Sequence, residues 1–227
     1  MILEQNIRGL CSKNGIDFLE FMNDLEIEHV NELTIYDLEA ICEEYNVSIE
    51  AMLFKPMQID SHLNKKIKNI KFLILDVDGV MTDGGMYFTA DGDELKKFNT
   101  KDGMGIMKAI KNGLHIGIIS SGFSDKIVKK RSEMLGIHKC YVGRDSKLNI
   151  LNQWMNEEGY SYEEVAMIGD DINDLEILQK IGVSACPSDA VKEIKSASQV
   201  ILNNQGGKGC IREFIDNYLS HSFKEQE

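Results

Sequence analysis

Short apolar runs alternate with longer amphipathic segments along the last two thirds of the chain, beginning at Ile70. Runs of this length predict buried strands, and apolar residues that recur every three or four positions predict helices between them. The strands are expected at residues 70–75, 114–120, 165–170, 183–186 and 199–202, and the helices at residues 103–112, 123–135, 147–158, 173–181, 190–196 and 210–219. Strands that alternate with helices form a parallel sheet covered on both faces. We therefore expect an α/β domain with a Rossmann-like sheet.

A different pattern occupies residues 86–98, where two short extended segments flank Asp91-Gly92. An Asp-Gly pair in this setting predicts a β-hairpin. The rest of the interval from Asp78 to Ser120 has room for one helix, and the interval from Ser120 to Lys147 for another. We therefore expect a hairpin flap and no cap domain. Because a lone hairpin is marginally stable in water, it should pack on a neighbour.

The first part of the chain predicts short helices and differs in charge. Residues 1–60 hold 13 Asp and Glu against 3 Lys and Arg, whereas the whole chain holds 37 against 25. Apolar residues at helical spacing cover residues 33–54, where Ser48 can cap a second helix. We predict an acidic helical module over residues 1–58, a linker over residues 59–69 and the α/β domain over residues 70–227.

Composition excludes several classes of protein. No uninterrupted apolar run reaches membrane-spanning length, and the first residues lack the pattern of a signal peptide. We therefore expect a cytoplasmic protein that does not bind membranes. The five cysteines are scattered and none forms a C-x-x-C pair, which indicates neither a disulfide framework nor a zinc site.

The first predicted strand of the α/β segment ends in two carboxylates, Asp76 and Asp78, followed by Gly79. If the strand conformation continues through them, both side chains point to one face. One carboxylate can then attack phosphorus while the other protonates the leaving oxygen and later activates water. A plain turn after a buried strand is one alternative. A calcium loop is another, although an EF-hand requires an oxygen ligand at Val80 and a glycine at Met81.

Further polar residues stand at the ends of later elements. Ser120 ends the second apolar run, Asp170 ends the third, and Lys147 opens a helix. Parallel strands place their carboxyl ends at one edge of the sheet, where α/β folds bind ligands. Taken singly, Ser120 is a candidate helix cap and Lys147 a candidate surface lysine. Their order relative to Asp76 and Asp170 favours a shared site.

This set of motifs resembles the haloacid dehalogenase superfamily of phosphatases. The likeness is closer to its 3-deoxy-manno-octulosonate 8-phosphate phosphatase branch and spans about residues 66–219, carried by Asp76–Gly84, Lys101–Gly105, Gly169–Asp174 and Gly206–Gly209. It implies a phosphatase acting on a small acidic sugar phosphate, either 3-deoxy-D-manno-octulosonate 8-phosphate or a related nonulosonate 9-phosphate. It also implies Mg²⁺ as cofactor and a homotetramer in which hairpins and the segment around Lys208 line adjacent active sites. A non-catalytic assembly module of a sugar-acid activation pathway stays open as an alternative.

The resemblance implies a role for each of these polar residues. Asp76 is expected to be the nucleophile and Asp78 the general acid and base, while Ser120 binds phosphate oxygens and Lys147 balances the carboxylate charge. Oxygens of three aspartates would bind Mg²⁺, and two more carboxylates would support them. The three metal ligands are Asp76, the backbone carbonyl of Asp78 and Asp170, and the two supporting residues are Asp171 and Asp174.

The chain departs from the branch directly after Ser120. Relatives have Gly followed by Arg, or by Glu where the substrate is a nine-carbon sugar 9-phosphate, and this chain has Ser121 and Gly122. These two residues are still expected to line the substrate, but another cation must meet the sugar-acid carboxylate. Lys208 is the first candidate, because neighbouring glycines let the backbone approach a ligand closely. The other candidates are Lys101, Lys126 and Arg212.

Residues 7–15 and 33–54 resemble the first and closing helices of the Cro/repressor helix-turn-helix family. The interval 16–32 is short for the usual second and recognition helices, and it carries six acids without a Lys or Arg. Phosphate contacts require basic residues. We therefore predict no nucleic-acid partner and expect the module to pack against protein, with a DNA-binding regulator as the alternative.

Overall fold

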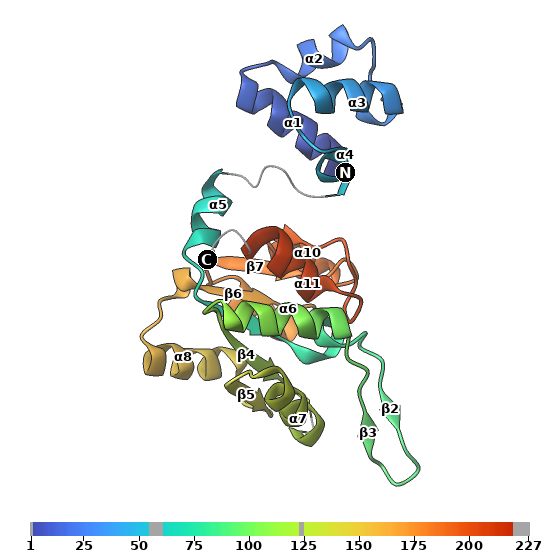
Figure 1. Cartoon of the computed structure of the whole chain (residues 1–227). Helices are drawn as coiled ribbons and strands as arrows, with labels where there is room; N and C mark the ends of the chain where they lie inside the picture. Colours follow the sequence, from blue (N-terminus) through green and yellow to red (C-terminus); the bar gives the residue numbers. More distant parts are fainter. Residues whose placement is uncertain (1, 55–60, 123–124, 220–227) are drawn as a thin grey trace. The chain divides into compact units, whose positions relative to one another are not determined.

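The computed structural model describes residues 2–54, 61–122 and 125–219, and the chain divides into two compact units, Met1–His62 and Leu63–Glu227. The described part of the first unit is helical, and its apolar residues form one core. Ser48 caps the last helix by accepting a hydrogen bond from the amide of Ala51 at 3.1 Å, as the sequence predicted. The elements are α1 (Ile2–Asn14), α2 (Phe18–Asp24), the 3₁₀ helix η1 (Val30–Glu32), α3 (Ile35–Glu44) and α4 (Ile49–Phe54) (Figure 1).

The second unit is built around a parallel sheet. Among the described residues it contains six strands in the order β5-β4-β1-β6-β7-β8. The predicted α/β fold with a parallel sheet is therefore confirmed. The strands are β1 (Phe72–Leu75), β4 (His115–Ser120), β5 (Lys139–Val142), β6 (Val165–Ile168), β7 (Val183–Cys186) and β8 (Val200–Ile201).

The strand order reverses beside β1. From β1 the chain proceeds to β4 and β5 on one side, and it then returns to β6 on the other side before β7 and β8. Such a reversal opens a crevice at the carboxyl ends of the two central strands. The loops after β1 and β6 therefore meet there.

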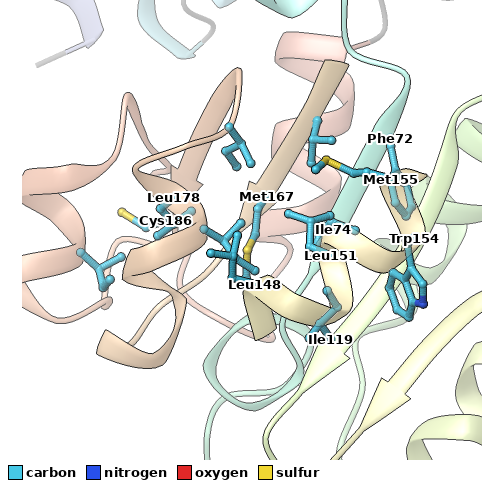
Figure 2. Packing of buried hydrophobic residues seen from close by; sticks show 14 of the residues in the cluster. Phe72, Ile74, Ile119, Leu148, Leu151, Trp154, Met155, Met167, Leu178 and Cys186 are labelled. Carbon is cyan, nitrogen blue, oxygen red and sulfur yellow. The ribbon is translucent and has the colours of Figure 1, made fainter. Parts of the chain in front are cut away.

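Helices cover both faces of the sheet. Phe72 and Ile74 of β1 pack in a cluster with Leu151 and Trp154 of α8, as Figure 2 shows. The alternate β1 residues are fully buried as well, which indicates cover on the opposite face. The helices of this unit are α5 (Ser61–Lys68), α6 (Thr100–Lys111), α7 (Asp125–Leu135), α8 (Lys147–Glu158), α9 (Leu175–Leu178), α10 (Lys192–Ala197) and α11 (Cys210–Phe214), with short helical turns at η2 (Val77–Met81), η3 (Tyr162–Glu164), η4 (Ile172–Asp174) and η5 (Ile215–Leu219).

The predicted hairpin is present as β2 (Tyr87–Phe88) and β3 (Glu94–Leu95), which pair antiparallel and project away from the body of the sheet unit (Figure 1). No cap domain interrupts the described residues between β1 and α8, as predicted. No helix in the described part of the chain is long and apolar enough to cross a membrane.

Two local predictions differ from the structure. The strand β5 was not predicted, because its half-buried residues Lys139 to Val142 include a lysine and lack a continuous apolar run. Residues 61–68, within the predicted linker, form α5, while residues 55–60 lie outside the described residues.

Candidate active site

The chain leaves β1 at Leu75 and turns at once. Asp76 and Asp78 have extended backbone angles, but the segment Val77–Met81 turns back on itself, closed by the hydrogen bond from the amide of Thr82 to Val77 O at 3.0 Å. The strand therefore does not continue through the two aspartates, in contrast to the condition assumed from sequence. Gly79 has φ +90°, a conformation that side chains with a β-carbon rarely adopt. The turn, rather than a strand face, directs the two carboxylates.

Three carboxylates meet at this edge of the sheet. Asp76, Asp170 and Asp174 each offer an oxygen within 4.8 Å of the others. Lys147, the first residue of α8, joins them: its Nζ donates to Asp76 Oδ1 at 2.9 Å and to Asp174 Oδ1 at 2.6 Å. Lys147 is buried, so the surface-lysine alternative is wrong. Three carboxylates against one ammonium leave an excess of negative charge.

The electrostatics of the cluster follow from burial and this excess. Burial and, after it, the charge of Asp174 raise the pKa of Asp76, and Lys147 opposes the rise, with a net value of about 7. Burial likewise raises the pKa of Asp170 to about 8, with Asp76 as the next cause. Both carboxylates are therefore poor at holding their charge without a cation nearby.

The residues present fit a small divalent cation. Asp170 Oδ1 is buried and has no hydrogen-bond partner among the described residues, and this carboxylate belongs to the cluster. Oxygen ligands with excess negative charge suit Mg²⁺. Gly79 makes room for this ligand: a β-carbon there would lie 2.0 Å from Asp170 Oδ2.

Asp174 differs from the other two carboxylates because its oxygens are already bonded. Oδ1 accepts from Lys147, and Oδ2 accepts from the backbone amides of Asp170 at 3.0 Å and Asp171 at 3.4 Å. It therefore fixes the loop that carries Asp170, consistent with the supporting role expected for it. Asp171 is exposed and accepts from the amide of Ile172 at 2.7 Å.

Asp78 lies across the site beside the end of β4. A β-carbon built on Gly122 would lie 3.4 Å from Ser120 Oγ and 3.9 Å from Asp78 Oδ2. Position 122 thus faces the space between Ser120 and Asp78, and as a glycine it places no side chain there. Ser120 is buried, and its Oγ accepts from the amide of Gly122 at 3.3 Å, so the helix-cap alternative is not what is observed. Ser121 Oγ accepts from Asn173 Nδ2 at 3.4 Å.

The structure also reveals a contact that sequence reasoning missed. Lys96, which follows β3 of the hairpin, places its Nζ 2.6 Å from Asp78 Oδ1. Its hairpin position was recognised, but nothing in the local pattern distinguished it from Lys97, which is exposed. The only available signal was its register, since Lys96 and Glu94 share one side of the hairpin.

The glycine-rich segment 205–209 packs against the turn Val77–Met81 that follows β1. The amide of Gly207 donates to Val80 O at 2.9 Å, and a β-carbon on Gly206 would lie 1.9 Å from Gly79 O. Asp102 anchors the following helix, because its Oδ1 accepts from the amide of Arg212 at 2.7 Å. Close approach of two backbones therefore explains why glycines occur here.

The predicted substrate-binding cations lie in different settings. Lys208 is exposed at the rim, where its charge lowers the pKa of Asp83 as a minor cause beside the hydrogen bond from Lys97. The Arg212 guanidinium pairs with Asp216. Lys101 in the first turn of α6 and Lys126 on α7 are exposed.

Comparisons with known proteins agree with this geometry. A profile of the haloacid dehalogenase-like hydrolases matches residues 23–214. The 3-deoxy-D-manno-octulosonate 8-phosphate phosphatase KdsC of Salmonella typhi is 36% identical over 161 residues, which are 71% of this chain and 85% of that protein.

Solved structures of related enzymes share the fold. The 3-deoxy-D-manno-octulosonate 8-phosphate phosphatase of Yersinia pestis superposes with a TM-score of 0.70 at 33% identity, covering 72% of this chain and 88% of that one. The Moraxella catarrhalis enzyme of the same name, in complex with a magnesium ion, a phosphate ion and a KDO molecule, superposes with a TM-score of 0.68 at 30% identity, covering 71% and 92%.

Proposed function

This chain belongs to the haloacid dehalogenase-like hydrolases and is a phosphatase homologous to KdsC, and on that premise we propose that it hydrolyses a small acidic sugar phosphate through an aspartyl-phosphate on Asp76. The first candidate substrate is 3-deoxy-D-manno-octulosonate 8-phosphate, the compound named for the relatives. A nonulosonate 9-phosphate is the second candidate. The observation that carries the proposal is the cluster of buried Asp76, Asp174 and Lys147 with half-buried Asp170 at the strand ends.

The chemistry assigned to Asp76 and Asp78 is a double displacement. An Asp76 oxygen forms a bond to phosphorus as the bond from phosphorus to the sugar oxygen breaks, and Asp78 gives its proton to that sugar oxygen. A water molecule then attacks phosphorus, Asp78 takes the water proton, and the bond between Asp76 and phosphorus breaks. The contact from Lys147 holds Asp76 in place for both attacks.

Mg²⁺ would be held by Asp76, the Asp78 carbonyl and Asp170, and it would neutralise phosphoryl charge when bound. The unpartnered oxygen of Asp170 supports this assignment. Ser120 is assigned to the phosphate oxygens, since its buried position beside Gly122 and Asp78 faces the same gap. The intact carboxylate set argues against a non-catalytic assembly module.

Recognition of the sugar acid is assigned to the rim of the site. Gly122 places no side chain in the space between Ser120 and Asp78, so recognition must come from residues elsewhere around the site. Lys208 is the preferred partner for the sugar-acid carboxylate, because its glycine-rich segment packs on the turn after β1. Arg212 is a weaker candidate, since its guanidinium is already paired. Lys101 and Lys126 are kept as exposed alternatives.

The homotetramer is the assembly we propose. Its support is the hairpin, whose apolar residues Met86, Tyr87, Phe88 and Leu95 are each more than half exposed in one chain. Apolar side chains gathered on a projecting hairpin are typical of an interface. Light scattering of the full chain at micromolar concentration should give the tetramer mass, whereas a fully active monomer would contradict the assembly.

Phosphate release from a panel of sugar phosphates, with Mg²⁺ and with EDTA, tests the function. We expect turnover of 3-deoxy-D-manno-octulosonate 8-phosphate that depends on Mg²⁺. Because Asp76→Asn removes the nucleophile, this variant should lose at least about 1,000-fold in kcat. Its melting temperature should stay that of the wild type. The matched control Asp24→Asn changes an exposed aspartate of the first unit and should retain wild-type activity. Asp76→Asn activity within about tenfold of wild type, free of contaminating phosphatase, would exclude covalent catalysis.

A further inference from the structure

Lys96 has a buried side chain on a hairpin whose apolar residues are exposed. Its side chain is 3% exposed, whereas the side chain of the next residue, Lys97, is 61% exposed. Leu95, the residue before it, is 55% exposed. Lysine is rarely buried in proteins unless its charge is paired. Of the two neighbouring lysines, the fold therefore buries Lys96 and leaves Lys97 exposed.

Two carboxylates hold the Lys96 ammonium. Its Nζ lies 2.6 Å from Glu94 Oε1 and 2.6 Å from Asp78 Oδ1. The Glu94 side chain is only 8% exposed, so the pair with Lys96 is shielded from water. Charge-assisted hydrogen bonds of this length are stronger than neutral ones. Lys96 is thus fixed by its own strand before it reaches the site.

The contact distinguishes the two oxygens of Asp78. Oδ1 accepts from Lys96, and the hydroxyl of Thr82 lies 3.4 Å from the same oxygen. Oδ2 points the other way, toward the gap beside Ser120, where a β-carbon on Gly122 would lie 3.9 Å from it. A carboxylate held at one oxygen cannot rotate freely about its terminal torsion.

We propose that Lys96 is a positioning residue for the acid and base steps of Asp78: it fixes Oδ1 so that Oδ2 faces the reacting phosphate. This inference rests on the proposed function. The proton on Asp78 Oδ2 passes to the sugar oxygen as the bond from that oxygen to phosphorus breaks. Oδ2 then takes a proton from the attacking water as the bond between Asp76 and phosphorus breaks. Oδ1 accepts from Lys96 throughout.

The choice of leaving group separates this role from a merely structural one. A sugar oxygen leaves as an alcohol and requires the proton of Asp78, whereas p-nitrophenolate leaves from p-nitrophenyl phosphate without one. Lys96→Gln should therefore lower kcat/KM, which reports the steps up to loss of the leaving group, about 10- to 100-fold for 3-deoxy-D-manno-octulosonate 8-phosphate and less than about threefold for p-nitrophenyl phosphate. Hydrolysis of the aspartyl-phosphate is common to both substrates, so any loss in that base step lowers kcat for both alike. Lys96→Arg keeps a buried cation and should recover part of the loss.

Two further variants keep the result interpretable. Lys97→Gln removes the neighbouring exposed cation, which pairs with Asp83 at 3.1 Å, and should leave both substrates unaffected. Glu94→Gln leaves Lys96 and Asp78 in place but releases the ammonium from its own strand. Glu94→Gln should lower activity less than Lys96→Gln does, and again more for the sugar phosphate than for p-nitrophenyl phosphate. This variant keeps the inference testable even if Lys96→Gln folds poorly.

A double substitution tests whether Lys96 acts through Asp78. Lys96→Gln placed in the Asp78→Asn background should cost nothing further, because the group that it positions is already lost. Additive losses, or equal losses of kcat/KM on both substrates, would overturn the inference while leaving the phosphatase function intact. Asp78→Asn losing kcat/KM equally for both substrates would remove the acid role of Asp78 and this inference with it, and a wild-type chain that hydrolyses neither substrate would overturn the proposed function.

Discussion

Replacing Gly79 by alanine tests the geometry of the metal site directly. The added β-carbon would lie 2.0 Å from Asp170 Oδ2 and 2.5 Å from its Cγ, which are severe steric clashes. The backbone itself would also be strained, because φ at Gly79 is +90°. The substitution therefore combines a backbone cost with displacement of one proposed metal ligand.

Gly113 provides a matched control for the backbone cost. It has the same φ of +90°, and a β-carbon there meets nothing within 4 Å. An alanine in this conformation costs about 1–2 kcal/mol. For a domain of this size each kcal/mol lowers the melting temperature by about 2–4 °C. Gly113→Ala should therefore melt about 2–8 °C lower while retaining activity.

Gly79→Ala should lose activity as well as stability. To escape the β-carbon, the Asp170 carboxylate must move by more than about 1 Å, since ordinary carbon–oxygen contacts exceed 3 Å. Disturbing the residues that orient a metal ligand typically lowers metal affinity or activity about 10- to 100-fold, and direct displacement of the ligand should reach at least the upper figure. About 100-fold corresponds to about 2.7 kcal/mol of transition-state stabilisation.

The assay is phosphate release at increasing Mg²⁺, together with thermal melting of both variants. We expect Gly79→Ala to require more Mg²⁺ for half-maximal activity, whereas Gly113→Ala follows wild type. If both alanine variants melt alike and both retain wild-type turnover and Mg²⁺ dependence, Asp170 is not a ligand held against Gly79, and the reasoning is refuted.

Two more predictions concern the charge of the cluster and of the first unit. The pKa values of Asp76 and Asp170, about 7 and about 8, exceed the ordinary value of 3.8, so the stability contributed by protonation is complete below pH 3.8 and is lost as pH rises through 7 and 8. In EDTA the melting temperature should fall as the pH is raised from 5.5 to 8. Mg²⁺ should raise the melting temperature more at pH 8 than at pH 5.5. A melting temperature in EDTA that rises over this range would show that the raised pKa values of Asp76 and Asp170 are not the cause. Residues 1–60 carry 13 acidic and 3 basic residues, and duplex DNA bears one negative charge per about 1.7 Å of its axis. The full chain should therefore not bind duplex DNA at physiological salt. Salt-sensitive binding at micromolar protein would instead support the DNA-binding regulator.

Deleting residues 1–62, in contrast, should leave turnover of p-nitrophenyl phosphate within about twofold of the full chain if the second unit holds the whole site. The grouped residues of the proposed site all lie in that unit. A smaller number of subunits per oligomer after the deletion would show that the first unit packs against protein to support assembly.

The local pattern of the sequence was sufficient for most of the fold. Buried parallel strands are continuous apolar runs, so β1, β4, β6 and β7 were each recognisable, and parallel pairing places their carboxyl ends together. Asp76 and Asp170 follow two of these strands, and their proximity is a consequence of strand order rather than of chance. The Asp91-Gly92 turn similarly determined the hairpin. These features depend on neighbours in sequence or on a general rule of topology.

Only the tertiary structure decided how the side chains share the site. Lys147 and Asp76 are 71 positions apart, and their hydrogen bond depends on where α8 begins relative to β1. The contact between Lys96 and Asp78 depends on the returning strand of the hairpin bringing Lys96 beside the turn after β1, which periodicity does not describe. The edge strand β5 was missed because a half-buried strand needs no apolar run. Patterns report burial along one element, whereas a site is made of distances between elements, and packing alone determines those distances.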